Sequence, residues 1–368
     1  MKKYDIAAYI WPAYTGKEPR TRMFWPDGIG EWQTTKLTHA YPEHDYVWDR
    51  KPLWGYKDEA DPEVMEMQIR EALRHGVNVF IYDRYWFDNR PLLEQCLNDG
   101  FLKAGNCNDM KLYILWVYHD ANYTWDYRNS SNFDTTIWEG TTTEKQFKII
   151  GKRWLTQYFT KENYYKIDGK PVVSIYDLSN FIATFGGVEN TAKNIQWLKE
   201  EAKNYGLPGV HLQLIKWGVQ PINLSGVDGG ALELTAELVV ALGFDSLTHY
   251  QMVHFTDVKR DYLEIIPDMV KEWEQTTKTF TVPYYPHVSI GWDNNPRFQK
   301  FRPEVVTNNT PENFKKALVL AKEFADAHNV TPLISVNSWN EWTETSYLLP
   351  DNVNGYGYLE AIRDVFGA

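Results

Sequence analysis

Short apolar runs rich in β-branched residues alternate along the chain with longer amphipathic stretches. Such runs, separated by polar segments, are typical of β-strands. An alternating series of this kind indicates an α/β protein rather than separate all-α and all-β parts. The eight predicted strands are residues 6–10, 77–82, 112–118, 172–176, 210–215, 245–250, 284–290 and 333–337.

Amphipathic helices are expected between these strands, and some have recognisable ends. Asp61 and Pro62 suit an N-cap and a first helical position, and Gly76 suits the end of that helix. Thr141 and Glu144 have capping-box spacing ahead of an apolar face. Further helices are expected from Thr310-Pro311 onward and at 92–104, 190–205, 230–242, 258–276 (interrupted by Pro267) and 358–366.

Eight strands alternating with about eight helices are the pattern of a (β/α)8 TIM barrel. An open doubly wound sheet gives the same alternation, but no GxGxxG or P-loop motif follows an early strand. We therefore expect one (β/α)8 catalytic domain over residues 1–368, with long loops at 11–61 and 119–141. We expect the aromatic residues of these loops to wall a cleft, with packing beneath the loops as the alternative: Trp11, Trp25, Trp32, Trp48, Trp54, Tyr123, Trp125, Tyr127 and Trp138.

Composition narrows the class of function. The chain has 38 Lys and Arg against 49 Asp and Glu, a net charge of −11, which opposes binding to nucleic acid or to an anionic membrane. Two cysteines cannot build a disulfide scaffold or a four-cysteine zinc site. Aromatic residues make up 15% of the chain, and the flat apolar faces of Trp and Tyr suit sugar rings, although core packing also uses them.

Location and cofactors follow from what the sequence lacks. The sequence contains no run of about 18 apolar residues, so no membrane span is predicted. The first residues lack the apolar stretch of a secretory signal, so the protein is expected to be either cytoplasmic or, as we favour, periplasmic or secreted with its leader removed. No metal or organic cofactor is expected, and the sequence leaves the oligomeric state open.

Two carboxylates follow the last predicted strand. Glu341 and Glu344 are three residues apart, at the strand end where a barrel displays its functional residues. Paired carboxyl groups about 5 Å or about 6.5–9.5 Å apart cleave glycosidic bonds. Trp339 and Trp342 beside them could desolvate one carboxylate and raise its pKa toward that of a general acid. Solvated loop glutamates are the alternative interpretation.

Residues at the other strand ends are candidates for holding a sugar. Asp83 could bind a hydroxyl or pair with Arg84 or Arg90, and Asp293 could bind a sugar or make a turn contact with Arg297. A zinc site at His119 is not expected, because no third ligand lies at suitable spacing. The candidates for substrate binding are Tyr9, Trp11, Asp83, Tyr85, Trp86, His119, Tyr176, Tyr250, Trp292, Asp293, Asn294, Trp339, Asn340 and Trp342.

The acidic segment Ser338-Trp339-Asn340-Glu341-Trp342-Thr343-Glu344 resembles the motif of glycoside hydrolase family 99, the endo-α-mannosidase family, and of its WbsX-like relatives. Four other segments are similar to the same group and occur in the expected order, so the resemblance spans nearly the whole chain. They are Tyr82-Asp83-Arg84-Tyr85-Trp86-Phe87, Phe101-Leu102-Lys103-Ala104-Gly105-Asn106, Gly169-Lys170-Pro171-Val172 and Gly291-Trp292-Asp293-Asn294-Asn295-Pro296-Arg297.

The resemblance implies a (β/α)8 barrel that cleaves glycosidic bonds with retention. In the endo-mannosidases, the first glutamate of the motif takes a proton from the sugar's own 2-hydroxyl, which then displaces the leaving group and forms a 1,2-anhydro sugar. By position Glu341 has that role, and Glu344 acts as acid and then base. This route requires a 2-hydroxyl trans to the leaving group, as in an α-manno or α-rhamno linkage. The expected substrate is therefore an oligo- or polysaccharide with such a linkage, which the enzyme degrades.

Some positions depart from the family pattern, which leaves the substrate open. Thr345 stands where a glycine commonly follows the second glutamate, Leu349-Pro350 replaces a later Glu-Pro, and the segment 116–122 follows the pattern loosely. Two alternative functions remain. One is a WbsX-like glycosyltransferase of surface polysaccharide synthesis, although no DxD or phosphate loop is present. The other is a catalytically inactive, carbohydrate-binding barrel.

Overall fold

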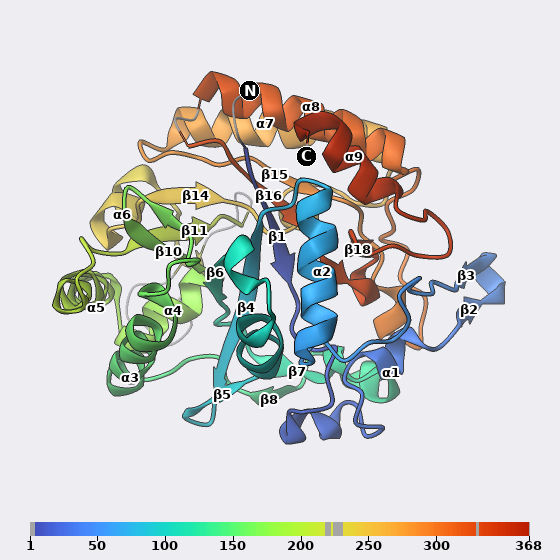
Figure 1. The fold of residues 1–368 in the computed structure, drawn as a ribbon, viewed down its shortest axis with the longest axis horizontal. Helices are drawn as coiled ribbons and strands as arrows, with labels where there is room; N and C mark the ends of the chain where they lie inside the picture. The colour runs from blue at the N-terminus through green and yellow to red at the C-terminus, as the bar shows by residue number, and fades with distance from the viewer. Residues whose placement is uncertain (1–3, 218–221, 224–230, 329–330, 368) are drawn as a thin grey trace.

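The computed structural model describes residues 4–217, 222–223, 231–328 and 331–367, and its centre is a parallel sheet curved into a barrel (Figure 1). The spatial order is β14-β11-β10-β6-β4-β1-β16-β15, and a parallel bridge between Leu247 and Tyr284 joins the two ends. The predicted (β/α)8 barrel is thus confirmed. The strands are β1 (Asp5–Ile10), β4 (Val79–Phe87), β6 (Lys111–Trp116), β10 (Lys170–Ile175), β11 (His211–Ile215), β14 (Ser246–Thr248), β15 (His287–Ser289) and β16 (Leu333–Asn337).

Helices surround the barrel and connect its strands (Figure 1). Their apolar faces pack on the sheet, as buried Met65, Ile69 and Ala72 do on the first of them. Within the described parts of the chain, no helix combines the length and apolar character needed to cross a bilayer. The helices are α2 (Pro62–Arg74), α3 (Glu144–Trp154), α4 (Leu178–Phe185), α5 (Val188–Glu201), α6 (Ala236–Leu242), α7 (Tyr262–Thr279), α8 (Pro311–His328) and α9 (Gly357–Phe366).

Several helices differ in detail from the prediction. Thr143, not Thr141, caps α3, because its side chain accepts a hydrogen bond from the backbone N–H of Gln146. Residues 92–104 form a short π-helix (Cys96–Gly100) and a 3-10 turn (Phe101–Lys103) instead of an α-helix. Helix α6 begins only after the strand β13 (Ala231–Leu232), since Thr235 is its N-cap.

Pro267 does not interrupt α7, which runs from Tyr262 to Thr279. The proline lies in the second turn of the helix, where the missing N–H removes only the hydrogen bond to the carbonyl of Leu263. The predicted interruption is therefore wrong. Strand β4 is also longer than predicted, because the antiparallel strand β5 (Arg90–Leu92) pairs with its far end.

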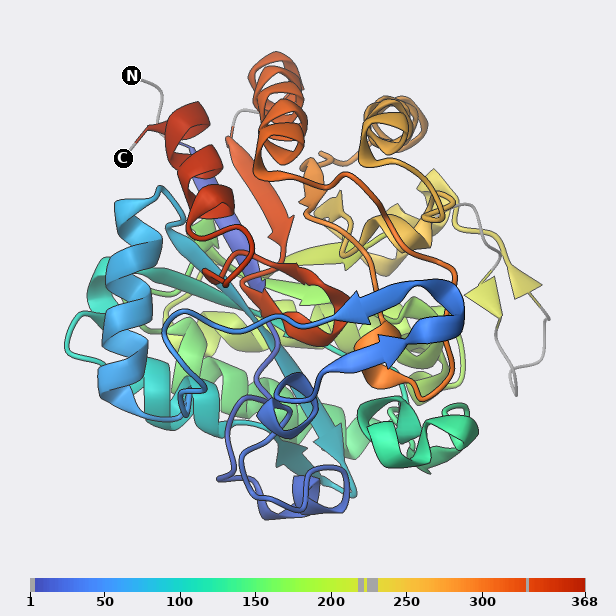
Figure 2. The same ribbon diagram turned by 90° about the vertical axis from the view of Figure 1, so that its right-hand side faces the viewer.

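The long loop after β1 crosses the mouth of the barrel. It contains α1 (Trp32–Thr35) and the hairpin of β2 (His39–Tyr41) and β3 (Tyr46–Trp48), which reaches the loop after β15 (Figure 2). There the Tyr41 hydroxyl donates to the carbonyl of Asn295 at 3.0 Å. The loop after β6 forms a second hairpin, β7 (Ala121–Asn122) and β8 (Thr136–Trp138), at the same end of the barrel. These two loops enclose the site described next.

Candidate active site

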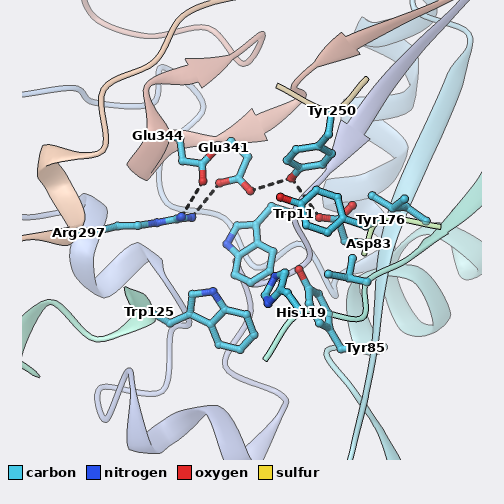
Figure 3. Close-up of a pocket in the computed structure, with 12 residues that line it drawn as sticks. Trp11, Asp83, Tyr85, His119, Trp125, Tyr176, Tyr250, Arg297, Glu341 and Glu344 are labelled. Carbon is cyan, nitrogen blue, oxygen red and sulfur yellow. Dashed lines mark hydrogen bonds and ion pairs between the residues drawn. The ribbon is translucent and has the colours of Figure 1, made fainter. Parts of the chain in front are cut away.

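A pocket of about 360 Å³, part of it open to solvent, lies at the C-terminal ends of the barrel strands (Figure 3). The ends of β1, β4, β6, β10, β14 and β16 and the loop after β15 all contribute to it. Its lining residues are Trp11, Asp83, Tyr85, Leu115, Val117, His119, Trp125, Tyr176, Tyr250, Arg297, Glu341 and Glu344.

Glu341 and Glu344 lie side by side because the chain turns sharply after β16. Glu341 ends the short strand β17 (Asn340–Glu341), and Glu344 ends the 3-10 turn that follows (Trp342–Glu344). One guanidinium binds both carboxylates (Figure 3): the Nη1 of Arg297 donates to Glu344 Oε1 at 2.7 Å, and its Nη2 donates to Glu341 Oε2 at 3.1 Å. The pair thus shares a single, buried cation.

A third buried carboxylate, that of Glu31, contacts Arg297 and the loop that carries the two glutamates. Its Oε1 lies 3.6 Å from the Nε of Arg297 and accepts a hydrogen bond from the Thr343 hydroxyl at 3.0 Å. Its Oε2 accepts from the indole N–H of Trp11 at 2.6 Å. Glu31, which belongs to the long loop after β1, therefore fixes both the cation of the site and one of its aromatic walls.

Tyr250 links the glutamates to Asp83 on the opposite side of the pocket. Its hydroxyl lies 3.3 Å from Glu341 Oε1 and 3.2 Å from Asp83 Oδ2. Among the described residues, Asp83 Oδ1 and Glu344 Oε2 have no hydrogen-bond partner although both atoms are buried. Because a buried carboxylate oxygen normally has a donor, these two oxygens are free to bind a polar ligand.

Burial raises the pKa of the carboxyl groups of the pocket. Burial raises the pKa of Glu341 well above its usual range, nearby Glu344 raises it further, and Arg297 opposes both effects. Burial also raises the pKa of Glu344, against the effect of Arg297, and that of Asp83. Two carboxyl groups that repel each other at close range hold a proton jointly at a pH where isolated ones would not.

Aromatic rings and one imidazole form the walls. Trp11 packs against Trp125 and Tyr85, with ring centroids 5.2 Å and 5.7 Å apart. His119 lies between Trp125 and Tyr176. Its Nδ1 is 2.8 Å from the carbonyl of Asp120, which only accepts, and burial lowers its pKa. His119 is therefore neutral, with Nε2 as an acceptor.

Eight of the predicted site residues come together in this pocket, and the others lie elsewhere. Trp86 points out of the barrel into a different cavity, because successive residues of β4 alternate between its faces and Asp83 and Tyr85 point inward. Trp292 and Asp293 line a separate cavity beneath the β2–β3 hairpin. Asp293 binds Asn295 and Tyr46 rather than Arg297, and the backbone carbonyl of Asn294 accepts from the backbone N–H of Arg297.

The remaining predicted residues are packed behind the pocket. Tyr9 is fully buried, and its hydroxyl donates to the carbonyl of His249. Trp339 donates to Gln68, and Trp342 stacks on Tyr347 with ring centroids 3.9 Å apart. The side chain of Asn340 bonds to the backbone N–H and carbonyl of Trp11, which fastens the acidic loop to the end of β1.

Arg297 and Glu31 are the members of the site that the sequence reasoning missed. Arg297 is the last residue of the segment 291–297 that resembles the glycoside hydrolase family 99 group, and as a cation in the loop after a predicted strand it could have been matched with the two glutamates. Glu31 carried no signal, because it lies far from any predicted strand end. Of the other aromatic residues expected to wall the cleft, Trp125 lines the pocket, whereas Trp48 lines the cavity of Trp292 and Trp32 and Trp54 line a third one.

The arrangement combines two carboxyl groups, which can donate and accept protons, with one cation. Among the described residues, no group of three or more His, Cys, Asp or Glu side chains is placed to hold a metal ion. Cys96 and Cys107 are free thiols. Asp83 pairs with neither Arg84 nor Arg90 as considered from the sequence; Arg84 binds Glu94 instead.

Comparisons with known proteins place this site in context. A model of the family described as glycosyltransferase WbsX matches residues 6–362. The uncharacterized protein WxcX, from two strains of Xanthomonas campestris pv. campestris, is 23% identical over 349 residues, which cover 94% of this chain and 47% of the relative. The chain thus spans about half the length of the curated relatives it matches.

Solved structures share the fold. A glycoside hydrolase-like protein superposes with a TM-score of 0.62 at 13% identity, over 100% of this chain and 95% of the other. The GH99 endo-α-mannosidase from Bacteroides thetaiotaomicron superposes with a TM-score of 0.60 at 15% identity, over 98% of this chain and 96% of the other. At such identities the likeness establishes a glycoside hydrolase-like fold. Because the family model matches residues 6–362, the chain belongs to the WbsX glycosyltransferase family, and its barrel is like that of the GH99 endo-α-mannosidase.

Proposed function

We propose that this protein is a retaining glycoside hydrolase that cleaves a manno- or rhamno-configured linkage in a polysaccharide. The observation that carries the proposal is the pair Glu341 and Glu344 on one guanidinium, at the strand ends of an aromatic pocket. A carboxyl pair of this kind supplies both the acid and the base that hydrolysis of a glycosidic bond requires.

The hydrogen bonds support separate roles for the two glutamates. Both oxygens of Glu341 face donors, Tyr250 and Arg297, which favours its ionised form and the role of base. Glu344 binds Arg297 through Oε1 only, so its unpaired Oε2 is the atom that can carry the shared proton. Glu344 is therefore the acid that protonates the leaving-group oxygen, and Glu341 removes a proton from the sugar.

The resemblance to the endo-mannosidase motif supports the sugar's own 2-hydroxyl as the group that Glu341 deprotonates. The bond from that oxygen to the anomeric carbon forms as the glycosidic bond breaks, and the leaving oxygen takes the proton of Glu344. Water then attacks the anomeric carbon of the 1,2-anhydro sugar while Glu344 takes a proton from it, the bond from that carbon to the 2-oxygen breaks, and Glu341 returns its proton to the 2-oxygen. Asp83, with one unpaired oxygen, and neutral His119 are placed to bind other hydroxyl groups.

The test is hydrolysis of a panel of bacterial and plant glycans by the wild-type protein and by Glu341→Gln and Glu344→Gln. We expect the wild type to release products with retained configuration, read by NMR, and each variant to lose at least about 1,000-fold in rate. Glu304→Gln, an exposed residue near the same loop, is the control and should keep full activity. Wild-type turnover by both active-site variants would remove the pair from the mechanism.

A glycosyltransferase is the second candidate, because the family carries that name. A sugar-nucleotide donor needs positive charge for its diphosphate. Among the described residues that line the pocket, the one Arg or Lys is Arg297, and it is already bound by the two glutamates. Titration calorimetry with a set of nucleoside-diphosphate sugars discriminates: saturable binding, with transfer to an acceptor glycan and no hydrolysis, would replace the hydrolase proposal. Glycan binding without any turnover would instead indicate an inactive, carbohydrate-binding barrel.

A further inference from the structure

A second cavity lies on the outer face of β4, behind the wall of the active-site pocket. It lies between the strand and the helix α3, and the room inside it suffices for one small particle such as a water molecule or a halide ion. Arg84, Trp86 and Tyr158 line it together with Glu94 and Arg153. None of these side chains has a part in the mechanism proposed above.

Two hydrogen-bond donors at this cavity are unsatisfied. The Nη1 of Arg84 and the indole Nε1 of Trp86 are buried and have no acceptor among the described residues. Both side chains are almost inaccessible, with 4% of Arg84 and 7% of Trp86 exposed. A buried donor without an acceptor is unfavourable by about 1–3 kcal/mol, and by more for a charged group, so a particle that accepts hydrogen bonds is favoured there.

The charges select the kind of acceptor. Glu94 is the carboxylate among the lining residues, and it already binds both Arg84 and Arg153. Two guanidinium groups and one carboxylate leave a net charge of +1 around the cavity. A water molecule would accept hydrogen bonds from the donors but would leave the net charge of this cluster unchanged. A small anion accepts from both donors and neutralises the cluster.

We propose that this cavity is a binding site for one small monovalent anion of the halide type, chloride in particular, held by Arg84 Nη1 and Trp86 Nε1. The limited room excludes sulfate and phosphate. Because Arg84 and Trp86 alternate along β4 with Asp83 and Tyr85 of the pocket, the bound ion braces the back of the active-site wall. The site does not depend on the proposed hydrolase activity.

The first experiment locates the ion. Crystals of the full chain grown in sodium chloride, measured at a long X-ray wavelength, should give an anomalous peak in the cavity within hydrogen-bonding distance of both nitrogens. Density without anomalous signal, or an empty cavity, would overturn the proposal in favour of a water molecule or no ligand.

The second experiment measures the thermodynamic linkage. Thermal unfolding at constant ionic strength should show Tm rising saturably with chloride in place of gluconate, since a ligand of the native state stabilises it. Trp86→Phe removes one donor and should weaken the apparent affinity at least about tenfold. Trp54→Phe is the matched control, because the Trp54 N–H donates to Tyr356 far from the cavity; it should keep the full chloride response. The site would be refuted if wild type and Trp86→Phe responded equally to chloride, or if chloride and gluconate gave the wild type the same Tm.

Discussion

At the scale of single residues, one cation, Arg297, interacts with three carboxylates of the pocket region. Arg297 contacts Glu341 and Glu344 through different nitrogens, and Glu31 lies behind it. Burial raises the pKa of both carboxyl groups, and the guanidinium opposes this effect. The side chain that sequence reasoning did not select thus opposes the rise in pKa that burial causes in the pair it did select.

Replacing this cation should move the pH dependence of catalysis in a defined direction. In Arg297→Met the pKa of Glu341 rises further, so the base becomes ionised only at higher pH. The acidic limb of the kcat/KM profile should therefore shift to higher pH, with a loss of about 100-fold at the wild-type optimum. Lys300→Met, which removes an exposed cation from the same loop, should leave the profile unchanged. An acidic limb that stays in place or moves to lower pH would show that Arg297 does not control the ionisation of Glu341.

Asp83 offers a test through stability rather than activity. Burial raises its pKa in the folded protein, so the native state holds a proton that the unfolded chain releases above about pH 4. The contribution of Asp83 to the free energy of unfolding is therefore fully present below that pH, and it is lost as the pH rises through the pKa that Asp83 has in the folded protein. Asp83→Asn mimics the protonated form, and the gain in its Tm over wild type should grow from near zero at pH 4 to several degrees at pH 8. A gap independent of pH would contradict this.

At the scale of elements, hydrogen bonds hold the acidic loop, residues 338–344, in place. Its two tryptophans, Trp339 and Trp342, do not line the pocket. Asn340 donates to the carboxylate of Glu59 at 2.8 Å and bonds to both backbone groups of Trp11. All of these atoms belong to buried residues, so no solvent replaces a lost partner. The side chain next to Glu341 therefore positions the acidic loop on the end of β1.

Asn340→Ala should consequently destabilise the protein and disorder the site together. We expect the free energy of unfolding to fall by about 2–4 kcal/mol, because several buried partners are left unpaired. Urea unfolding followed by circular dichroism measures this. Asn352→Ala is the matched control, because the exposed Asn352 also makes hydrogen bonds but lets water replace them; its stability should change by less than about 0.5 kcal/mol. Equal effects in the two variants would contradict the positioning role.

Much of this element-level picture could be predicted, and the part that could not has a physical reason. The rule that barrel sites lie at strand ends placed Asp83, Tyr85 and Glu341 correctly near one pocket. It failed for Trp86 because it ignores the alternation of side chains along a strand, which was readable from the sequence. The direction of Trp342 was not readable, since a 3-10 turn after β16 decides it.

At the scale of the whole molecule, the barrel is closed unevenly. Ladders of three or more residue pairs join the other neighbouring strands, whereas the isolated bridge between Leu247 and Tyr284 joins β14 to the segment before β15. Strand order and closure follow from the periodic alternation of elements, which is why the fold was predictable. The weak seam was not, because it depends on how few residues of 284–290 remain extended.

The seam should be the place where the barrel opens most readily. Backbone hydrogen bonds at Leu247 and Tyr285 have few neighbours in the same ladder, so local opening exposes them at lower free energy than those of β4 and β6. Native-state hydrogen exchange should show protection at Leu247 and Tyr285 that is at least about tenfold lower than at Phe80 and Ile81. Equal protection would show that the barrel opens only as one unit.

The long loop after β1, which ends at α2, shapes the mouth of the pocket. It also contains Glu31, whose carboxylate contacts the guanidinium of Arg297. Under the proposed hydrolase activity, one loop therefore affects both which saccharide enters and the charge around Arg297. Replacing this loop with that of a homologue, in order to change which saccharide enters, would also remove the Glu31 carboxylate that lies beside Arg297. Remodelling the entrance without losing turnover requires an acidic side chain to be retained at position 31.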